Sequence, residues 1–235
     1  MKFLPTSTSF DEAERGASVA VLPVGSFEQH GHFLPLTTDT MVACAIAESL
    51  ANKFGLFLLP PVSFGCSHEH AGFAGTISIG AVTLCRVIED IRASLELQEV
   101  RKLVLVNGHG GNYVLGNIVQ EANVDKPRMA LFPHRDDWEQ ARKTAGMATS
   151  NHEDMHGGEL EVSILLAAAP EAVREIDTSD DHMSSDRTHL HIRGMAGYTE
   201  SGIVGRPSLG DATKGKLALE ELTAAFEAHL RFLLD

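Results

Sequence analysis

The feature that most restricts the fold of this chain is an apolar run at residues 102–106 (KLVLV), which lies between two helical patterns. A strand without a polar face must be covered on both sides, as strands of parallel sheets usually are. Residues 18–24 (SVAVLPV), 56–62 (LFLLPPV) and 129–133 (MALFP) are further apolar runs of strand length. The chain therefore contains several candidates for one buried sheet.

Helical patterns separate these apolar runs. They cover residues 39–53, 82–97, 112–123, 159–169 and 212–234. This alternation predicts an α/β fold, a three-layer sandwich with a mostly parallel central sheet. No repeat or linker divides the chain, so we expect one domain over residues 1–235. Residues 177–193 and 194–210 are predicted to be extended surface loops that can close over a site.

Four short blocks of the chain concentrate imidazoles and carboxylates. They are residues 28–31 (EQHG) with Asp39, 67–70 (SHEH), 107–112 (NGHGGN) and 154–161 (DMHGGELE). The first three follow predicted strands, whose carboxyl ends share one edge in a parallel sheet, where sites of open α/β folds form. His nitrogen and Asp or Glu oxygen suit zinc, manganese or iron. The pattern therefore predicts a divalent-metal hydrolase.

Each block also allows a simpler interpretation. Asp39 stands where a helix begins, so its carboxylate could serve only as a cap. A nucleotide loop in the third block would need glycine at position 113, where Tyr113 stands. We interpret those glycines as a tight turn that presents His109. In the fourth block, acidic residues favour a helix start, which accounts for one glutamate but not for the combination with Asp154 and His156.

Five other histidines are predicted to be solvated loop residues rather than ligands: His134, His152, His182, His189 and His191. A net charge of −13 argues against nucleic acid as a partner. No apolar run approaches the length of a membrane span and no signal peptide is evident. Three cysteines without CxxC spacing are expected to be free thiols. We therefore expect a soluble cytoplasmic protein that binds neither nucleic acid nor membrane.

The blocks together resemble the creatininase family of metal-dependent amidohydrolases. The resemblance rests on residues 23–31 (PVGSFEQHG), 34–39 (LPLTTD), 67–70 (SHEH), 73–76 (FAGT), 107–112 (NGHGGN), 156–163 (HGGELEVS) and 201–205 (SGIVG). It implies a creatininase-like fold, two divalent ions (Zn, Mn or Fe) per subunit and a homo-oligomer, with a hexamer as one possibility.

The resemblance also implies roles for individual residues. Glu28 and His109 would bind one ion, His30 and Glu161 the other, and Asp39 would bridge the two. His156 is the candidate general acid. Ser67, Glu69 and His70 are expected to bind or orient the substrate, and Glu159 to support a metal ligand.

Departures from the creatininase enzyme bear on the substrate. Gly111 stands where that enzyme has a glutamate ligand, which leaves the first ion one ligand short. Gly110 and His152 stand near the positions of a tyrosine and a tryptophan that enclose its flat ring. We therefore expect a substrate other than creatinine.

The leading hypothesis from the sequence is hydrolysis of a small amide C–N bond, in a cyclic amide, lactam or formamide, by a metal-bridging hydroxide. One alternative is a metallopeptidase of the kind that trims the mycofactocin precursor. Another is a metal-stabilised binding protein without turnover.

Overall fold

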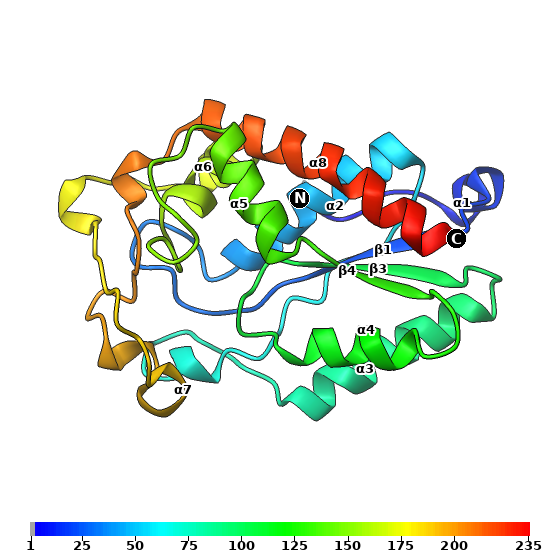
Figure 1. Cartoon of the computed structure of the whole chain (residues 1–235), viewed down its shortest axis with the longest axis horizontal. Coiled ribbons are helices and arrows are strands. Elements are labelled where there is room, and N and C mark those ends of the chain that lie inside the picture. Colours follow the sequence, from blue (N-terminus) through cyan, green and yellow to red (C-terminus); the bar gives the residue numbers. More distant parts are fainter. Residues whose placement is uncertain (1–2) are drawn as a thin grey trace.

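A computed structural model describes residues 3–235 of the chain and centres on a four-stranded sheet (Figure 1). Met1 and Lys2, which belong to the predicted 1–235 domain, lie outside the described residues. The strands are β1 (Val19–Val24), β2 (Phe57–Leu58), β3 (Lys102–Asn107) and β4 (Met129–Phe132), in the order β2-β1-β3-β4. Neighbouring strands are parallel throughout, so the predicted α/β fold with a parallel sheet is confirmed.

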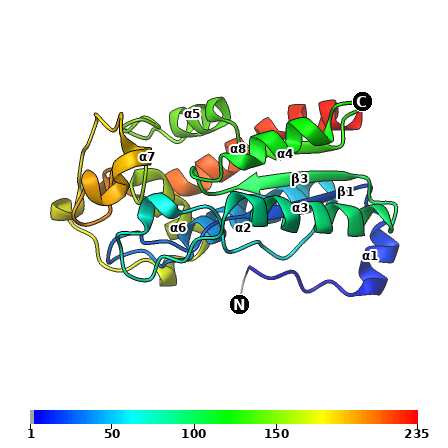
Figure 2. The same ribbon diagram turned by 90° about the horizontal axis from the view of Figure 1, so that it is seen from below.

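Helices cover both faces of the sheet (Figures 1 and 2). On one face lie α3 (Ala81–Glu96) and α4 (Val114–Ala122); on the other lie α2 (Thr38–Phe54), α6 (Glu159–Ala168) and α8 (Ala212–Leu234). Alternate residues of β1 enter different cores: Val19 and Val21 join the α2, α6 and α8 side, while Ala20 and Leu22 join the α3 and α4 side. Both faces of the strand are buried, which explains why its sequence shows no polar alternation.

The second strand is shorter than the apolar run 56–62 predicts. Regular pairing with β1 covers only Phe57 and Leu58, because Pro60 and Pro61 have no N–H to donate. The chain returns to the sheet at Val62, whose N–H donates to the Pro23 carbonyl over 2.9 Å. Residues 63–70 therefore still leave the sheet beside the end of β1.

Several helices have no strong signal in the sequence. They are α1 (Ser9–Arg15), α5 (Arg135–Thr144) and α7 (Leu190–Arg193), together with short 3-10 helices at His68–His70, Pro170–Ala172, Thr178–Asp180, Met195–Gly197 and Pro207–Leu209. In α5 only Ala141 and Arg142 are buried, so no apolar stripe marks it. Among residues 3–235, no helix has the length and apolar character needed to cross a bilayer.

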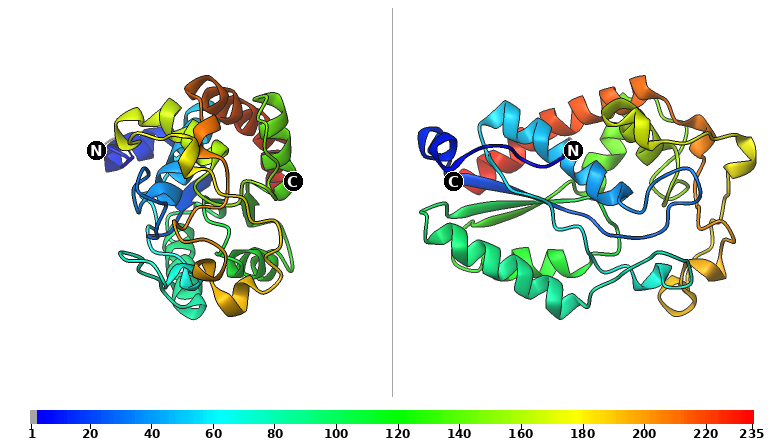
Figure 3. Two further views of the ribbon diagram at one scale, coloured as in Figure 1. Left: turned by 90° about the vertical axis from the view of Figure 1, so that its left-hand side faces the viewer. Right: turned by 180° about the vertical axis from the view of Figure 1, so that it is seen from behind.

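The segment predicted as surface loops, residues 177–210, gathers at one end of the molecule (Figure 3). It is not all remote from the rest of the fold, because Val204 forms an antiparallel bridge with His156. The carbonyl of Gly202 also accepts a hydrogen bond from Gln29 Nε2 over 2.9 Å. The two motifs at residues 154–161 and 201–205 are thus held together.

Candidate metal centre

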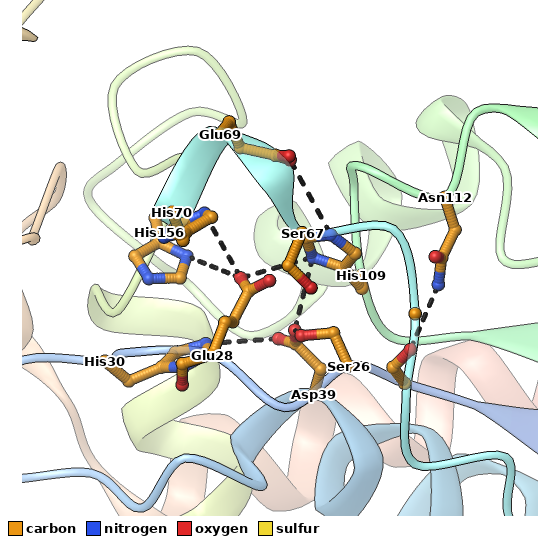
Figure 4. Close-up of polar contacts among 12 residues, drawn as sticks. Ser26, Glu28, His30, Asp39, Ser67, Glu69, His70, His109, Asn112 and His156 are labelled. Atoms are coloured by element: carbon orange, nitrogen blue, oxygen red, sulfur yellow. Dashed lines mark hydrogen bonds and ion pairs between the residues drawn. The ribbon is translucent and has the colours of Figure 1, made fainter. Parts of the chain in front are cut away.

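Five side chains from different parts of the sequence meet beyond the carboxyl ends of β1 and β3. Figure 4 labels Glu28, His30, Asp39 and His109 among them. Glu28 and His30 lie in the loop after β1, and His109 lies in the loop after β3. Asp39 and Glu161 stand in the first turns of α2 and α6. All but Glu161 are at most 5% exposed. The first, third and fourth blocks therefore converge, which the topology predicts for the first and third and the resemblance implies for the fourth.

The five side chains form two groups that share Asp39. In the first group, His109 Nδ1 lies 3.2 Å from Glu28 Oε1 and 3.2 Å from Asp39 Oδ2. In the second, His30 Nε2 lies 3.1 Å from Asp39 Oδ1 and 3.9 Å from Glu161 Oε1. The two carboxylate oxygens of Asp39 thus face different imidazoles, the arrangement that a bridging ligand requires.

Backbone carbonyls orient both imidazoles. His30 Nδ1 lies 3.1 Å from the Glu28 carbonyl oxygen, and His109 Nε2 lies 3.0 Å from that of Cys66. A carbonyl can only accept, so each of these nitrogens carries the hydrogen in a neutral ring. His30 Nε2 and His109 Nδ1 face the carboxylates and are the nitrogens left to bind either a proton or a metal ion. This is how protein metal ligands are usually held.

Glu28 supplies the strongest sign that the site suits a cation. Its side chain is fully buried, and neither carboxylate oxygen accepts a hydrogen bond within the described residues. A buried ionised carboxylate is costly unless positive charge lies close to it. Nitrogens of His70, His109 and His156 lie 3.2, 3.2 and 3.6 Å from Oε1. A metal ion among these groups would satisfy the carboxylate.

The electrostatics of the cluster point the same way. Burial by itself lowers the pKa of His30, but Asp39 and the neighbouring glutamates overcome this and raise it to about 9. The pKa of His109 is likewise raised well above its usual value by Glu28 and Asp39, against the effect of burial. Burial raises the pKa of Glu161 to about 7. The carboxylates therefore favour positive charge at both groups.

Glycines let the third block approach its neighbours closely. A Cβ on Gly108 would lie 2.2 Å from the Asp39 carbonyl oxygen, and one on Gly111 would lie 2.1 Å from Glu69 Oε1 and 2.4 Å from His109 Nε2. Neither glycine has a positive φ. The chain does turn at residues 110 and 111, as predicted, and Gly108 and Gly111 in addition leave the space that neighbouring atoms occupy.

His156 forms a third candidate donor group with Glu28 and His30, and it lies in a network arranged by Gln29. Its Nε2 is 2.7 Å from the Gln29 carbonyl oxygen and therefore carries the hydrogen, which leaves Nδ1 as the basic nitrogen. The side-chain amide of Gln29 then donates to His70 Nδ1, 3.0 Å away, and to the Gly202 carbonyl. Burial, with His30 and His70 nearby, lowers the pKa of His156 well below its usual value. His156 is thus neutral at pH 7.

Three side chains of the second block, Ser67, Glu69 and His70, have different surroundings at the cluster. Ser67 Oγ is buried without a hydrogen-bond partner among the described residues. Glu69 Oε1 lies 3.6 Å from His109 Nε2, and burial raises the pKa of this carboxyl. His70 Nε2 lies against Glu28, and burial lowers the His70 pKa to about 4. The block therefore lies at the cluster, as the order of strands predicts.

Two acidic residues of the fourth block, Asp154 and Glu159, form hydrogen bonds away from the five clustered side chains. Glu159 accepts hydrogen bonds from the backbone of Ala148 and Thr149 and from Lys214 Nζ, so it contacts none of the five clustered side chains through these bonds. Asp154 accepts from the backbone N–H of Glu159 over 2.7 Å and thereby holds the start of α6. The helix-start interpretation thus describes Asp154, while Glu161 and His156 face the cluster.

Three polar residues at the centre were not singled out from the sequence. Ser26 Oγ donates to Asp39 Oδ2 over 2.8 Å, Gln29 orients His70 and His156, and Asn112 joins the loops after β1, β2 and β3. Asn112 Nδ2 donates to the Gly25 carbonyl, while its Oδ1 accepts from Cys66 N. Their position inside the EQHG and NGHGGN blocks, or just before EQHG, was the available signal.

Comparisons with known proteins bear on the family and the fold of the chain. Residues 5–230 match the sequence model of a family described as creatininase, creatinine amidohydrolase. The mycofactocin precursor peptide peptidase of Mycolicibacterium smegmatis is 32% identical over 93% of this chain and 86% of its own length. The creatinine amidohydrolase of Pseudomonas putida is 28% identical over 71% of this chain and 70% of its own.

Solved structures show a similar fold. Creatininase with manganese has a TM-score of 0.78 at 22% identity, and a creatininase variant of the Zn–Zn type has a TM-score of 0.78 at 23% identity. Each comparison covers 98% of both chains. At this level of identity the structural likeness establishes the fold, which is that of creatininase.

Proposed function

Because the chain belongs to the creatininase family, we propose that it is a metal-dependent hydrolase that cleaves an amide C–N bond. The observation that carries the proposal is the pair of donor groups joined by Asp39, beside a buried Glu28 carboxylate that accepts no hydrogen bond. A metal centre of this kind would favour hydrolysis, because it would stabilise the negative charge that develops on the substrate carbonyl oxygen.

The proposed centre holds two divalent ions. Glu28, Asp39 and His109 would hold the first, and His30, Asp39 and Glu161 the second. Imidazole nitrogen and carboxylate oxygen suit zinc, manganese and iron, and related creatininase structures are described with manganese and with zinc. The side chain of Glu69, rather than one at Gly111, fills the space beside His109.

The reaction depends on proton transfer by the protein. When bound, the two ions would lower the pKa of a water molecule and polarise the carbonyl group of the substrate. His156, neutral and with its basic Nδ1 3.6 Å from Glu28 Oε1, takes a proton from the attacking water and returns it to the leaving nitrogen. Gln29 fixes the tautomer that this transfer requires. The amide C–N bond breaks, and a carboxylate and an amine form.

The residues of the second block divide the remaining tasks. Ser67 Oγ, buried and without a partner among the described residues, is the proposed donor to a polar atom of the substrate. Glu69 extends the polar wall of the site beside His109. His70 holds Glu28 in place through its contact over 3.2 Å, so its contribution to substrate binding is indirect.

Two classes of substrate follow from the comparisons. The 32% identity to a mycofactocin precursor peptide peptidase over nearly the whole chain favours a short peptide. The weaker similarity to a creatinine amidohydrolase favours a small cyclic amide. We place the peptide first, because Gly110 and His152 stand where an enclosure for a flat ring would need aromatic side chains.

The test is a turnover assay on protein loaded separately with Mn²⁺, Zn²⁺ or Fe²⁺. Short peptides, lactams, formamides and creatinine are incubated with the protein, and the products are identified by mass spectrometry. We expect cleavage of peptides or of another amide class, with creatinine the poorest substrate.

His156→Ala is the control variant for this assay, and its metal content is measured alongside. Loss of turnover at unchanged metal content supports the proposed proton transfer, while undiminished turnover removes His156 from it. If fully loaded protein cleaves none of these amides, the binding-protein alternative becomes the better account.

A further inference from the structure

A second cluster of metal-binding side chains lies apart from the candidate metal centre. His134 precedes α5, Asp137 stands in its first turn, and His229 lies near the end of α8. One ligand atom from each lies within 4.8 Å of the others. His229 Nε2 is 3.2 Å from Asp137 Oδ2. These residues share no contact with the proposed hydrolytic machinery.

Aromatic packing holds the His229 ring in one orientation. The ring lies edge-on to Phe132 at 5.1 Å between centroids and nearly parallel to Phe226 at 6.4 Å. The His134 ring meets it edge-on at 5.1 Å. A donor fixed in this way loses little conformational freedom when it binds an ion.

An ion pair between Asp137 and His229 accounts for only part of this arrangement. That pair needs one imidazole, while a second one, from His134, stands at the same place as the N-cap residue of α5. The Asp137 carboxylate accepts from the backbone N–H of His134 over 2.7 Å, which fixes the carboxylate beside both rings. The sequence predicts His134 to be a solvated loop residue. It does not reveal that His229, far away in the chain, lies beside this residue in the fold.

The site is open to solvent on one side. His134 is exposed, while Asp137 and His229 are half-buried. A cavity of about 350 Å³ is lined by both histidines together with Asn123, Leu131 and Phe232. Water can therefore complete the coordination of an ion held by the three side chains.

We propose that His134, Asp137 and His229 form an additional site for a zinc-like divalent ion. Two imidazoles, one carboxylate and a water molecule make a tetrahedral donor set that Zn²⁺ accepts. An ion bound there joins the start of α5 to the end of α8, two helices that already pack on each other. The site stabilises the position of the C-terminal helix and takes no part in amide hydrolysis.

Co²⁺ is the probe for this site, because its visible absorption reports coordination. The full-length protein, with its hydrolytic centre loaded, is titrated with Co²⁺ and the bound metal per chain is counted after gel filtration. His229→Phe keeps the ring packing but removes the donor. His134→Asn keeps a residue that caps the helix well. His189→Asn, in an exposed loop, is the matched control.

We expect the wild type and His189→Asn to bind one more ion per chain than either cluster variant. The loss of a direct ligand should weaken metal binding more than about 100-fold, because the removal of a group that only orients a ligand already weakens it by up to about 100-fold. The thermal midpoint should rise on adding Zn²⁺ in the wild type but less in His229→Phe. Equal metal counts in the wild type, His229→Phe and His134→Asn would overturn the proposal.

Discussion

Two glycines of the NGHGGN block, two residues apart, should respond differently to substitution by alanine. A Cβ added at Gly108 would lie 2.2 Å from the carbonyl oxygen of Asp39 and 3.2 Å from Ala43 Cβ. At Gly110 nothing lies within 4 Å of the added atom. Gly108→Ala therefore tests the close approach that brings His109 to Asp39, and Gly110→Ala is its control.

The magnitude follows from what the new atom meets. The 2.2 Å contact is 1.2 Å shorter than an ordinary contact of 3.4 Å, and the neighbour is backbone, which cannot rotate away. Overpacking of this kind costs about 1–3 kcal/mol, and the loss of glycine entropy in the unfolded chain returns about 0.4–1 kcal/mol. We expect a net loss of about 1.3 kcal/mol for Gly108→Ala and no loss for Gly110→Ala, where the added atom meets nothing within 4 Å.

Urea unfolding of metal-free protein measures these free energies. The metal content of each variant shows whether Asp39 and His109 are still placed to bind an ion. A shift of about 1 Å between Asp39 and His109 should also weaken metal binding, since both belong to one donor group. If Gly108→Ala is as stable as Gly110→Ala and retains its metal, the argument from close approach is refuted.

Three further outcomes are expected. Arg142→Met should lower the free energy of unfolding in urea by about 3 kcal/mol, because it leaves the buried Asp154 carboxylate without the guanidinium 2.9 Å away; a loss below about 1 kcal/mol would speak against this. In steady-state assays, His156→Ala should lower kcat by at least about 100-fold at unchanged metal content; an unchanged kcat would exclude the proposed proton transfer. Burial, with Glu48 nearby, raises the pKa of Cys44 to about 12, so its thiol stays protonated at pH 8. Cys44 should therefore react with iodoacetamide only after unfolding. Mass spectrometry that finds modified Cys44 in the folded protein would contradict this.

Much of the fold was predictable because its buried strands and long helices carry strong patterns. The last helix begins and ends where the sequence predicts, at Ala212 and Leu234. The failures have physical reasons. Pro60 and Pro61 shorten β2 by removing donors, and α1 buries no side chain, so only its capping box with Thr8 and Asp11 marks it.

The candidate site was predictable where residue type and topology agreed. Glu28, His30 and His109 follow strands of one parallel sheet, so their convergence follows from the fold. The support of the site was harder to foresee. Gln29 acts through distant partners such as Gly202, which no local pattern connects to it. Gly108 serves a contact with the backbone of another element, which spacing alone does not reveal.

The central claim is that two donor groups share Asp39 and hold two metal ions. Elemental analysis of purified protein tests it most directly, after equilibration with manganese, zinc or iron and in the His229→Phe background, so that the additional site does not add to the count. We predict a metal content approaching two ions per chain, falling sharply in Asp39→Asn because both groups lose a ligand. Protein that binds no metal with any of these ions, or an Asp39→Asn variant that keeps the full content, would contradict the account.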